Sequence, residues 1–140
     1  MSITRERLLA YRSKKQERDQ IIEQIERLEA ALYYPKPQRL SDMPKGSTVE
    51  DAMGNMVAKR EALLEHYRSL EATLTEDMLE IEQAIEGLSE DARMFMRYRY
   101  LMGYKANAIC RAMNMSLSTI YRLQNEALRE LGIWPATPTR

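Results

Sequence analysis

Four polar side chains near the carboxyl end of the chain have the spacing of one helix face. Ser118, Tyr121, Arg122 and Asn125 stand at positions i, i+3, i+4 and i+7, which a helix brings to the same side. Arginine can donate two hydrogen bonds to guanine, asparagine can pair in a bidentate way with adenine, and serine and tyrosine can hold phosphate. Such a face could bind DNA, and an ordinary solvated helix face is the alternative.

Two short helices joined by a turn must position this face. From Ala106 onward the sequence fits a helix-turn-helix template, in which one helix supports a second helix that lies in the major groove. The turn position holds Asn114, a residue that tolerates the left-handed conformation. Ser116 is a natural N-cap for the second helix, which we expect over residues 117–131. The small and apolar places of the template are all filled, by Ile109, Cys110, Met113, Met115, Ile120 and Leu123.

Basic residues are concentrated around the same stretch. The whole chain has a net charge of zero, but residues 92–125 contain six basic side chains and no acidic one. A cationic block suits a polyanion, because phosphates that are neutralised release their counterions. Beside Lys105 and Arg122, the block supplies four further candidates for phosphate contact, which are Arg93, Arg97, Arg99 and Arg111.

A third helix precedes the template. Gly87 can end the element before it, Ser89 can cap the next first turn, and Gly103 can end a helix over residues 90–101. Its apolar members face a small core. We therefore predict a compact three-helix domain over residues 88–132, followed by a tail at 133–140. The expected core residues of this helix are Ala92, Phe95, Met96 and Tyr100.

The first part of the chain carries a heptad pattern. Positions 11, 14, 18, 21, 25, 28 and 32 step by three and four residues, and the later ones are isoleucine or leucine, as in the seam of a coiled coil. Lys14 and Arg18 interrupt the pattern early, so we expect tight packing toward Leu32 and looser packing toward the amino terminus. Three prolines and a glycine within residues 33–48 cannot continue a helix and predict a linker.

A second seam runs from Val49 to Leu88, with Arg60 and Asp77 as polar mismatches. A single helix here would be roughly 60 Å long and could not bury its stripe alone. It could fold back on the first helix as a long antiparallel hairpin, which charges of +3 over residues 1–40 and −7 over residues 41–87 favour. The other option is pairing with a second subunit. We predict an all-α chain with a coiled-coil-like hairpin over residues 1–87 and expect a homodimer through the long helices.

The sequence shows no constellation of residues that is typical of catalysis or metal binding. Cys110 and His66 are the single cysteine and the single histidine, which excludes a disulfide framework within the chain and the usual zinc clusters. The sequence has no phosphate-cradling glycine loop and no nucleophile with its base. We expect no catalysis, no metal and no cofactor. The sequence also lacks the apolar run of a signal peptide or membrane span, so we expect a cytoplasmic protein that does not bind membranes.

The run "LSEDARMFMRYRYLMGYKANAICRAMNMSLSTIYRLQNEALREL" resembles region 4 of sigma-70-type factors. With the words "RLSDMPKGS" and the long charged helix, the chain is similar to small phage-encoded regulators of Gram-positive hosts, akin to the ArpU and RinA late-gene activators. The resemblance implies promoter binding and an interaction with RNA polymerase. The sequence departs from the family where "YKANAIC" replaces a more usual polar cap. Carried over by position, the resemblance implies a recognition set of Ser116, Ser118, Thr119, Tyr121, Arg122 and Asn125, with Lys105 near the DNA backbone.

These observations lead to one hypothesis and two alternatives. We predict a DNA-binding transcriptional regulator of phage or prophage genes that acts in the cytoplasm of a bacterial host. A packaging protein similar to small terminase subunits is the first alternative, since those proteins also join a helix-turn-helix to oligomerising coiled coils. A coiled-coil adaptor that binds protein is the second. Oligomer size separates regulation from packaging, and the salt dependence of binding separates DNA from protein partners.

Overall fold

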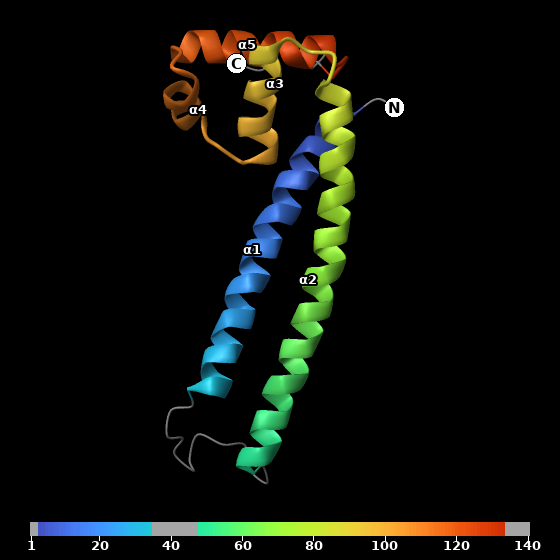
Figure 1. Ribbon diagram of the computed structural model, residues 1–140, viewed down its shortest axis with the longest axis vertical. Coiled ribbons are helices and arrows are strands. Elements are labelled where there is room, and N and C mark those ends of the chain that lie inside the picture. The colour runs from blue at the N-terminus through green and yellow to red at the C-terminus, as the bar shows by residue number, and fades with distance from the viewer. Residues whose placement is uncertain (1–2, 35–47, 134–140) are drawn as a thin grey trace. The chain divides into compact units, whose positions relative to one another are not determined.

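The structure, a computed structural model, describes residues 3–34 and 48–133. Within these ranges every regular element is helical, as expected (Figure 1). The predicted linker and tail lie almost entirely outside the described residues. The elements are α1 (Arg5–Tyr33), α2 (Val49–Ile85), α3 (Glu90–Met96), the π-helical segment η2 (Arg97–Leu101), α4 (Ala106–Met113) and α5 (Leu117–Glu130).

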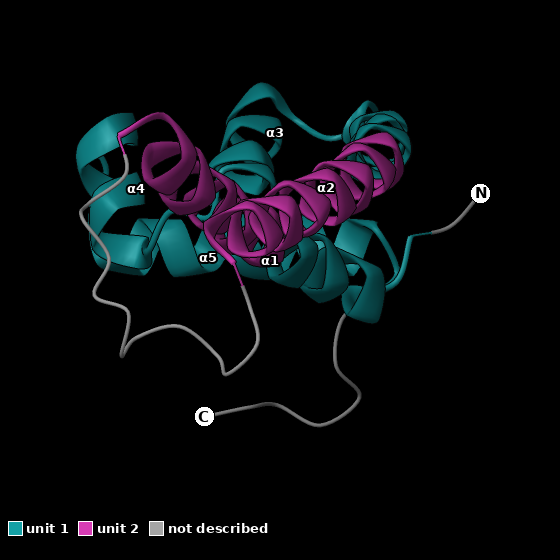
Figure 2. Ribbon diagram, turned by 90° about the horizontal axis from the view of Figure 1, so that it is seen from below, with its two compact units in different colours: residues 1–15, 74–140 teal, residues 16–73 magenta. Residues whose placement is uncertain are grey.

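The chain divides into two compact units, which are coloured separately in Figure 2. Unit 1 comprises residues 1–15 and 74–140, and unit 2 comprises residues 16–73. The helices α1 and α2 each contribute to both units, whereas α3, η2, α4 and α5 belong to unit 1. The predicted domain bounds, which follow the helix end near Gly87, stay a prediction.

Unit 2 consists of two helical segments that run antiparallel. Arg18 of α1 donates to Glu71 of α2 at 3.0 Å, and Arg60 of α2 donates to Glu29 of α1 at 3.2 Å. The earlier residue of α1 thus pairs with the later residue of α2, and the later one with the earlier. Arg18 and Arg60 are two of the residues that interrupt the apolar seams, so these interruptions are satisfied by ion pairs between the helices.

Burial along the first seam does not increase toward Leu32. Our prediction of tighter packing toward Leu32 is wrong, because Leu32 is only half-buried, whereas Tyr11, Ile21 and Ile25, and Leu8 just before the seam, are buried. Leu8 and Tyr11 belong to unit 1, which also contains the end of α2 and all the later helices. The described residues of unit 2 form two helical segments, and two helices cannot enclose an apolar stripe. The buried side chains among these described residues are Ile21 and Ile25.

The later helices of unit 1 share one core. α3 packs against α5 and η2, and α4 packs against the same two elements. Ser89 caps α3 as predicted, since its hydroxyl accepts a hydrogen bond from the Ala92 amide at 3.3 Å. The core side chains of these four elements are Ala92, Phe95, Met96, Tyr100, Leu101, Ile109, Ile120, Leu123, Ala127 and Leu128, which include the four predicted for residues 90–101.

The helix predicted over residues 90–101 changes its winding after Met96. In η2 the Met102 amide donates to the carbonyl of Arg97 at 2.8 Å, the i to i+5 pattern of a π-helix. The chain then turns at Gly103, whose φ of 76° lies in the left-handed region that favours glycine. The predicted end at Gly103 is therefore confirmed. Lys15 Nζ donates to the carbonyl of Leu101 at 2.6 Å and so ties α1 to the end of η2.

Candidate nucleic-acid interface

The connection between α4 and α5 has the predicted turn geometry. Asn114 adopts φ 55° and ψ 50° in the left-handed region, and its amide donates to the carbonyl of Cys110. The Met115 amide donates to the same carbonyl at 3.0 Å, so the turn satisfies an exposed end of α4. Ile109 of α4 and Ile120 of α5 are both buried. The prediction for Asn114 is confirmed.

Ser116 begins α5, as the sequence predicts. Its Oγ accepts a hydrogen bond from the Thr119 amide at 3.3 Å, which satisfies one of the free amides of the first turn. The same Oγ lies 2.9 Å from Thr119 Oγ1 and 3.2 Å from Ser118 Oγ. Ser116 and Ser118 are exposed and Thr119 is half-buried. Three hydroxyls therefore form one hydrogen-bonded group at the start of α5.

One side of α5 is buried and the opposite side is open. The apolar side chains of the helix fill the core described above. The polar ones that we predicted to share a face are exposed, and Tyr121 is exposed over 47% of its surface. The exposed members are Ser118, Tyr121, Arg122 and Asn125.

Three basic side chains of this region carry their charge without an internal partner. Within residues 3–34 and 48–133, no ion pair or side-chain hydrogen bond involves Lys105, Arg111 or Arg122, and all three are exposed. Lys105 is the N-cap residue of α4, and its side chain makes no capping hydrogen bond. This agrees with the sequence, in which the segment "YKANAIC" lacks the polar cap residue that is more usual in the resembled family. These three cations are available to an external anion.

Arg97, by contrast, is paired with Glu82 of α2. Its Nε and Nη2 donate to the two carboxylate oxygens at 2.8 and 2.9 Å. This bidentate hydrogen bond lowers the pKa of Glu82 and raises the pKa of Arg97, so both stay charged near neutral pH. Because the carboxylate already neutralises it, Arg97 can contribute little to phosphate binding in this arrangement.

Arg93 and Arg99 donate to backbone carbonyls. Arg93 Nη1 lies 2.7 Å from the carbonyl oxygen of Leu88, and Arg99 Nη1 lies 3.3 Å from that of Tyr104. Part of the hydrogen-bonding capacity of both side chains is therefore used within the chain. The six basic residues of the acid-free stretch therefore fall into two groups, three with internal partners and three without.

Two further features bear on function. Among the described residues, no group of three or more histidine, cysteine, aspartate or glutamate side chains could hold a metal ion. No helix in those ranges is long and apolar enough to cross a membrane.

The family of the chain follows from its sequence. Residues 37–132, more than half of the chain, match the family described as protein of unknown function, DUF1492. The chain belongs to the DUF1492 family. No curated protein and no solved structure matches it.

The DUF1492 match contains every candidate DNA contact. It spans α2, α3, η2, α4 and α5 and leaves α1 outside. Every residue that we predicted to touch DNA, from Arg93 to Asn125, lies within it.

One exposed residue of the DUF1492 region was not among our predicted contacts. Leu117, the first residue of α5, is exposed over 43% of its surface. The helix-turn-helix template places no requirement on this position, and an apolar residue at a helix start more often indicates core than surface. The sequence alone therefore gave no signal for its exposure.

Proposed function

We propose that this protein binds double-stranded DNA with sequence selectivity, and that α4 and α5 form a helix-turn-helix whose second helix enters the major groove. The observation that carries the proposal is the open side of α5. Residue types that read bases stand together there, and the sequence has no acidic residue between Asp91 and Glu126. A protein-binding face of mixed charge would not need such a stretch.

The polar residues of the predicted recognition set have roles that their chemistry suggests. Arg122 donates to guanine and Asn125 pairs with adenine, because these are the bidentate contacts that the major groove offers. Ser118 and the amides of the first turn that Ser116 does not cap hold a phosphate. Tyr121 contributes its hydroxyl to the backbone or its ring to a base edge. Ser116 and Thr119 chiefly cap the helix and so fix its start.

The two groups of basic residues have different roles. Lys105 and Arg111 contact phosphates, because they are exposed and have no partner among the described residues. Arg97 stabilises the packing of η2 against α2 through Glu82. Arg93 and Arg99 likewise stabilise the fold through backbone carbonyls. The affinity for phosphate thus depends on fewer cations than the charge of the stretch suggests.

The biological role that fits best is transcriptional regulation of phage or prophage genes in the bacterial cytoplasm. The support is the resemblance of residues 88–131 to region 4 of sigma-70-type factors, in which a helix-turn-helix binds promoter DNA beside RNA polymerase. The capped turn between α4 and α5 is compatible with that arrangement. RNA polymerase is accordingly the proposed protein partner, and no catalytic activity is assigned.

We also propose that α1 and α2 close as a hairpin within one chain and that two chains dimerise through these helices. The ion pairs between α1 and α2 support the hairpin. Apolar surface in unit 2 supports the dimer, since Val49, Met53 and Val57 are exposed at steps of four residues along α2.

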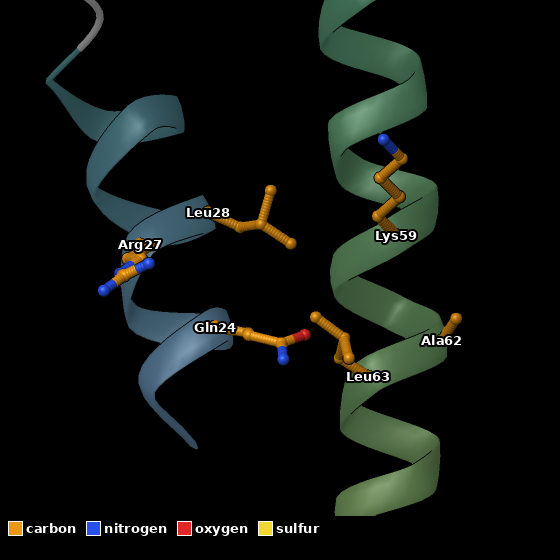
Figure 3. A pocket seen from close by; sticks show the side chains of 6 residues that line it. All are labelled: Gln24, Arg27, Leu28, Lys59, Ala62 and Leu63. Atoms are coloured by element: carbon orange, nitrogen blue, oxygen red, sulfur yellow. The ribbon is translucent and has the colours of Figure 1, made fainter. Parts of the chain in front are cut away.

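A cavity of about 490 Å³ opens in the same unit, where Leu28 and Leu63 extend toward the opposite helix (Figure 3). Its lining residues are Gln24, Arg27, Leu28, Lys59, Ala62 and Leu63.

A gel shift with the full chain tests DNA binding. The probe is a duplex selected by the protein from a randomised library. Arg122→Ala and Asn125→Ala should each weaken binding to this duplex roughly 5- to 150-fold, the loss expected for one bidentate base contact. Helical content, measured by circular dichroism, should not change because both side chains are exposed. Unchanged binding by both variants would overturn the proposal.

Matched substitutions on α2 serve as controls. Arg68→Ala removes an exposed arginine and Asn55→Ala removes an exposed asparagine, both far in sequence from α5. Neither should change the affinity for the selected duplex by more than about twofold, since nonspecific surface charge has only a small effect at moderate salt. An equal loss in the controls would show that the effect of the α5 variants is not specific to the face.

A further inference from the structure

One stripe of side chains along α5 is buried near the carboxyl end of the helix and exposed near its start. Leu117, Tyr121 and Leu128 stand at i, i+4 and i+11, which places them on one stripe of the helix. Leu128 is 4% exposed, whereas Leu117 and Tyr121 are 43% and 47% exposed. The stripe is therefore buried only where the rest of unit 1 reaches it, and its first two turns present large apolar side chains to the outside.

This bare stripe borders the proposed reading face. Tyr121 directly precedes Arg122, and Asn125 lies one turn further on from Tyr121. Any surface that approaches Arg122 and Asn125 must also meet the apolar side chains beside them. The occupant must therefore combine negative charge, for the unpartnered cations Arg111 and Arg122, with an apolar group at the level of the first two turns.

Duplex DNA supplies that combination in one chemical form. In the major groove, thymine presents a 5-methyl group beside its O4 acceptor, and side-chain carbons contact this methyl group in direct readout. The first turns of a groove-bound recognition helix are the part that reaches base edges. Leu117 and Tyr121 occupy those turns.

We propose that the DNA site of this protein contains thymine opposite the first two turns of α5, and that Leu117 recognises its 5-methyl group with Tyr121 beside it. The inference rests on the proposed function and adds a base preference to it. Leu117 and Tyr121 are specificity-determining residues, which select thymine over cytosine and uracil. Arg122 and Asn125 read the neighbouring bases.

Replacement of thymine by uracil tests this contact, because it removes the 5-methyl group and leaves base pairing unchanged. The affinity of the full chain is measured first for the selected duplex. It is then measured for a series of duplexes in each of which one thymine is replaced by uracil. The wild-type protein should lose affinity about fourfold at the contacted position, which corresponds to about 0.8 kcal/mol for one buried methyl-sized group. Leu117→Ala should bind both duplexes equally, and Leu117→Met should keep most of the preference.

The control variant is Leu79→Ala, which removes an exposed leucine of α2. It should keep the wild-type preference for thymine. If the wild-type protein binds every uracil duplex as well as the thymine duplex, or if Leu117→Ala keeps the preference, the inference is overturned. If either of these results is found but Arg122→Ala still weakens DNA binding, the thymine contact is wrong and the proposed function remains supported. Absence of any salt-dependent binding to duplex DNA, or binding of a protein partner through this face instead, would overturn both.

Discussion

The ammonium group of Lys14 lies 2.9 Å from the carboxylate of Asp77, and both residues occupy heptad positions where the other members are mostly apolar. Arg7 donates to the same carboxylate at 3.3 Å. Asp77 is mostly buried, with 15% of its side chain exposed. A polar pair within an apolar seam favours one register, because a shift of either helix separates the charges. Two of the four polar interruptions in the seams, Lys14 and Asp77, are therefore partners.

Removal of one member of this pair should destabilise the protein more than removal of both. Asp77→Leu leaves Lys14 and Arg7 beside an apolar side chain and should lower the free energy of unfolding by about 1–2 kcal/mol. The double variant Lys14→Leu, Asp77→Leu should recover most of that loss, because the seam becomes continuous. Urea denaturation measures both. Additive losses in the double variant would show that the pair does not act as a unit.

Local features of the sequence predicted the helices well. Ser89, Ser116, Asn114 and Gly103 end or begin helices through hydrogen bonds and backbone angles that depend on a few neighbouring residues. The sequence also predicted the exposure of the polar face of α5, since the 3.6-residue period places its polar side chains opposite the buried Ile120.

Features that depend on distant neighbours were not predictable. The pairing of Arg97 with Glu82 joins residues from two different helices, and no pattern within either helix indicates it. Leu8 is fully buried although it lies outside the heptad positions, so the heptad pattern does not reveal its burial. The exposure of Leu117 depends on how far the core reaches along α5. The residues of the candidate site could therefore be predicted from their types and spacing. Only the folded structure shows which of its basic residues have internal partners and which do not.

Asn114 should resist replacement by any residue other than glycine. Its φ of 55° lies in the left-handed region, where alanine costs about 1–2 kcal/mol more than in the right-handed region. Asn114→Ala should therefore lower the melting temperature by several degrees, and Asn114→Gly should leave it nearly unchanged. Differential scanning calorimetry measures both. Equal melting temperatures for the two variants would contradict the turn geometry.

The ion pair of Glu82 with Arg97 should contribute stability that depends on pH. The hydrogen bond from Arg97 lowers the pKa of Glu82 in the folded state. The contribution is therefore present above the ordinary glutamate pKa and is lost as the pH falls through the lowered value. Because 44% of the Arg97 side chain is exposed, the gain should be no more than about 1 kcal/mol.

Unfolding of the wild-type protein and of Glu82→Gln in urea, at a series of pH values, measures this contribution. The wild-type protein should be more stable at pH 7, and the two stabilities should converge in strong acid. A constant difference at all pH values would contradict the assignment to the Glu82 carboxylate.

The salt dependence of DNA binding should distinguish the two groups of basic residues. Lys105→Ala and Arg111→Ala should each reduce the slope of log K against log salt by about 1, because each removes one phosphate contact. Arg97→Ala should leave the slope nearly unchanged, since Glu82 already neutralises Arg97. Fluorescence anisotropy at several salt concentrations gives the slopes. Equal slope changes for all three variants would show that the internal pair opens on binding.

The oligomeric state should be a dimer held by the helices of unit 2. Val57→Glu places a charge on exposed apolar surface of α2 and should shift the protein toward the monomer without loss of helical content. Light scattering of the full chain measures the mass. A wild-type monomer would contradict the proposed dimer, and a ring of eight or more subunits would favour a packaging role over regulation.

Selection of duplexes from a randomised library measures whether α5 recognises a particular DNA sequence. The wild-type protein should enrich one short motif, and the double variant Arg122→Ala, Asn125→Ala should enrich none while it keeps its helical content and some salt-dependent affinity for DNA. If the double variant enriches the same motif as the wild-type protein, α5 does not read the DNA sequence and the proposed function is wrong.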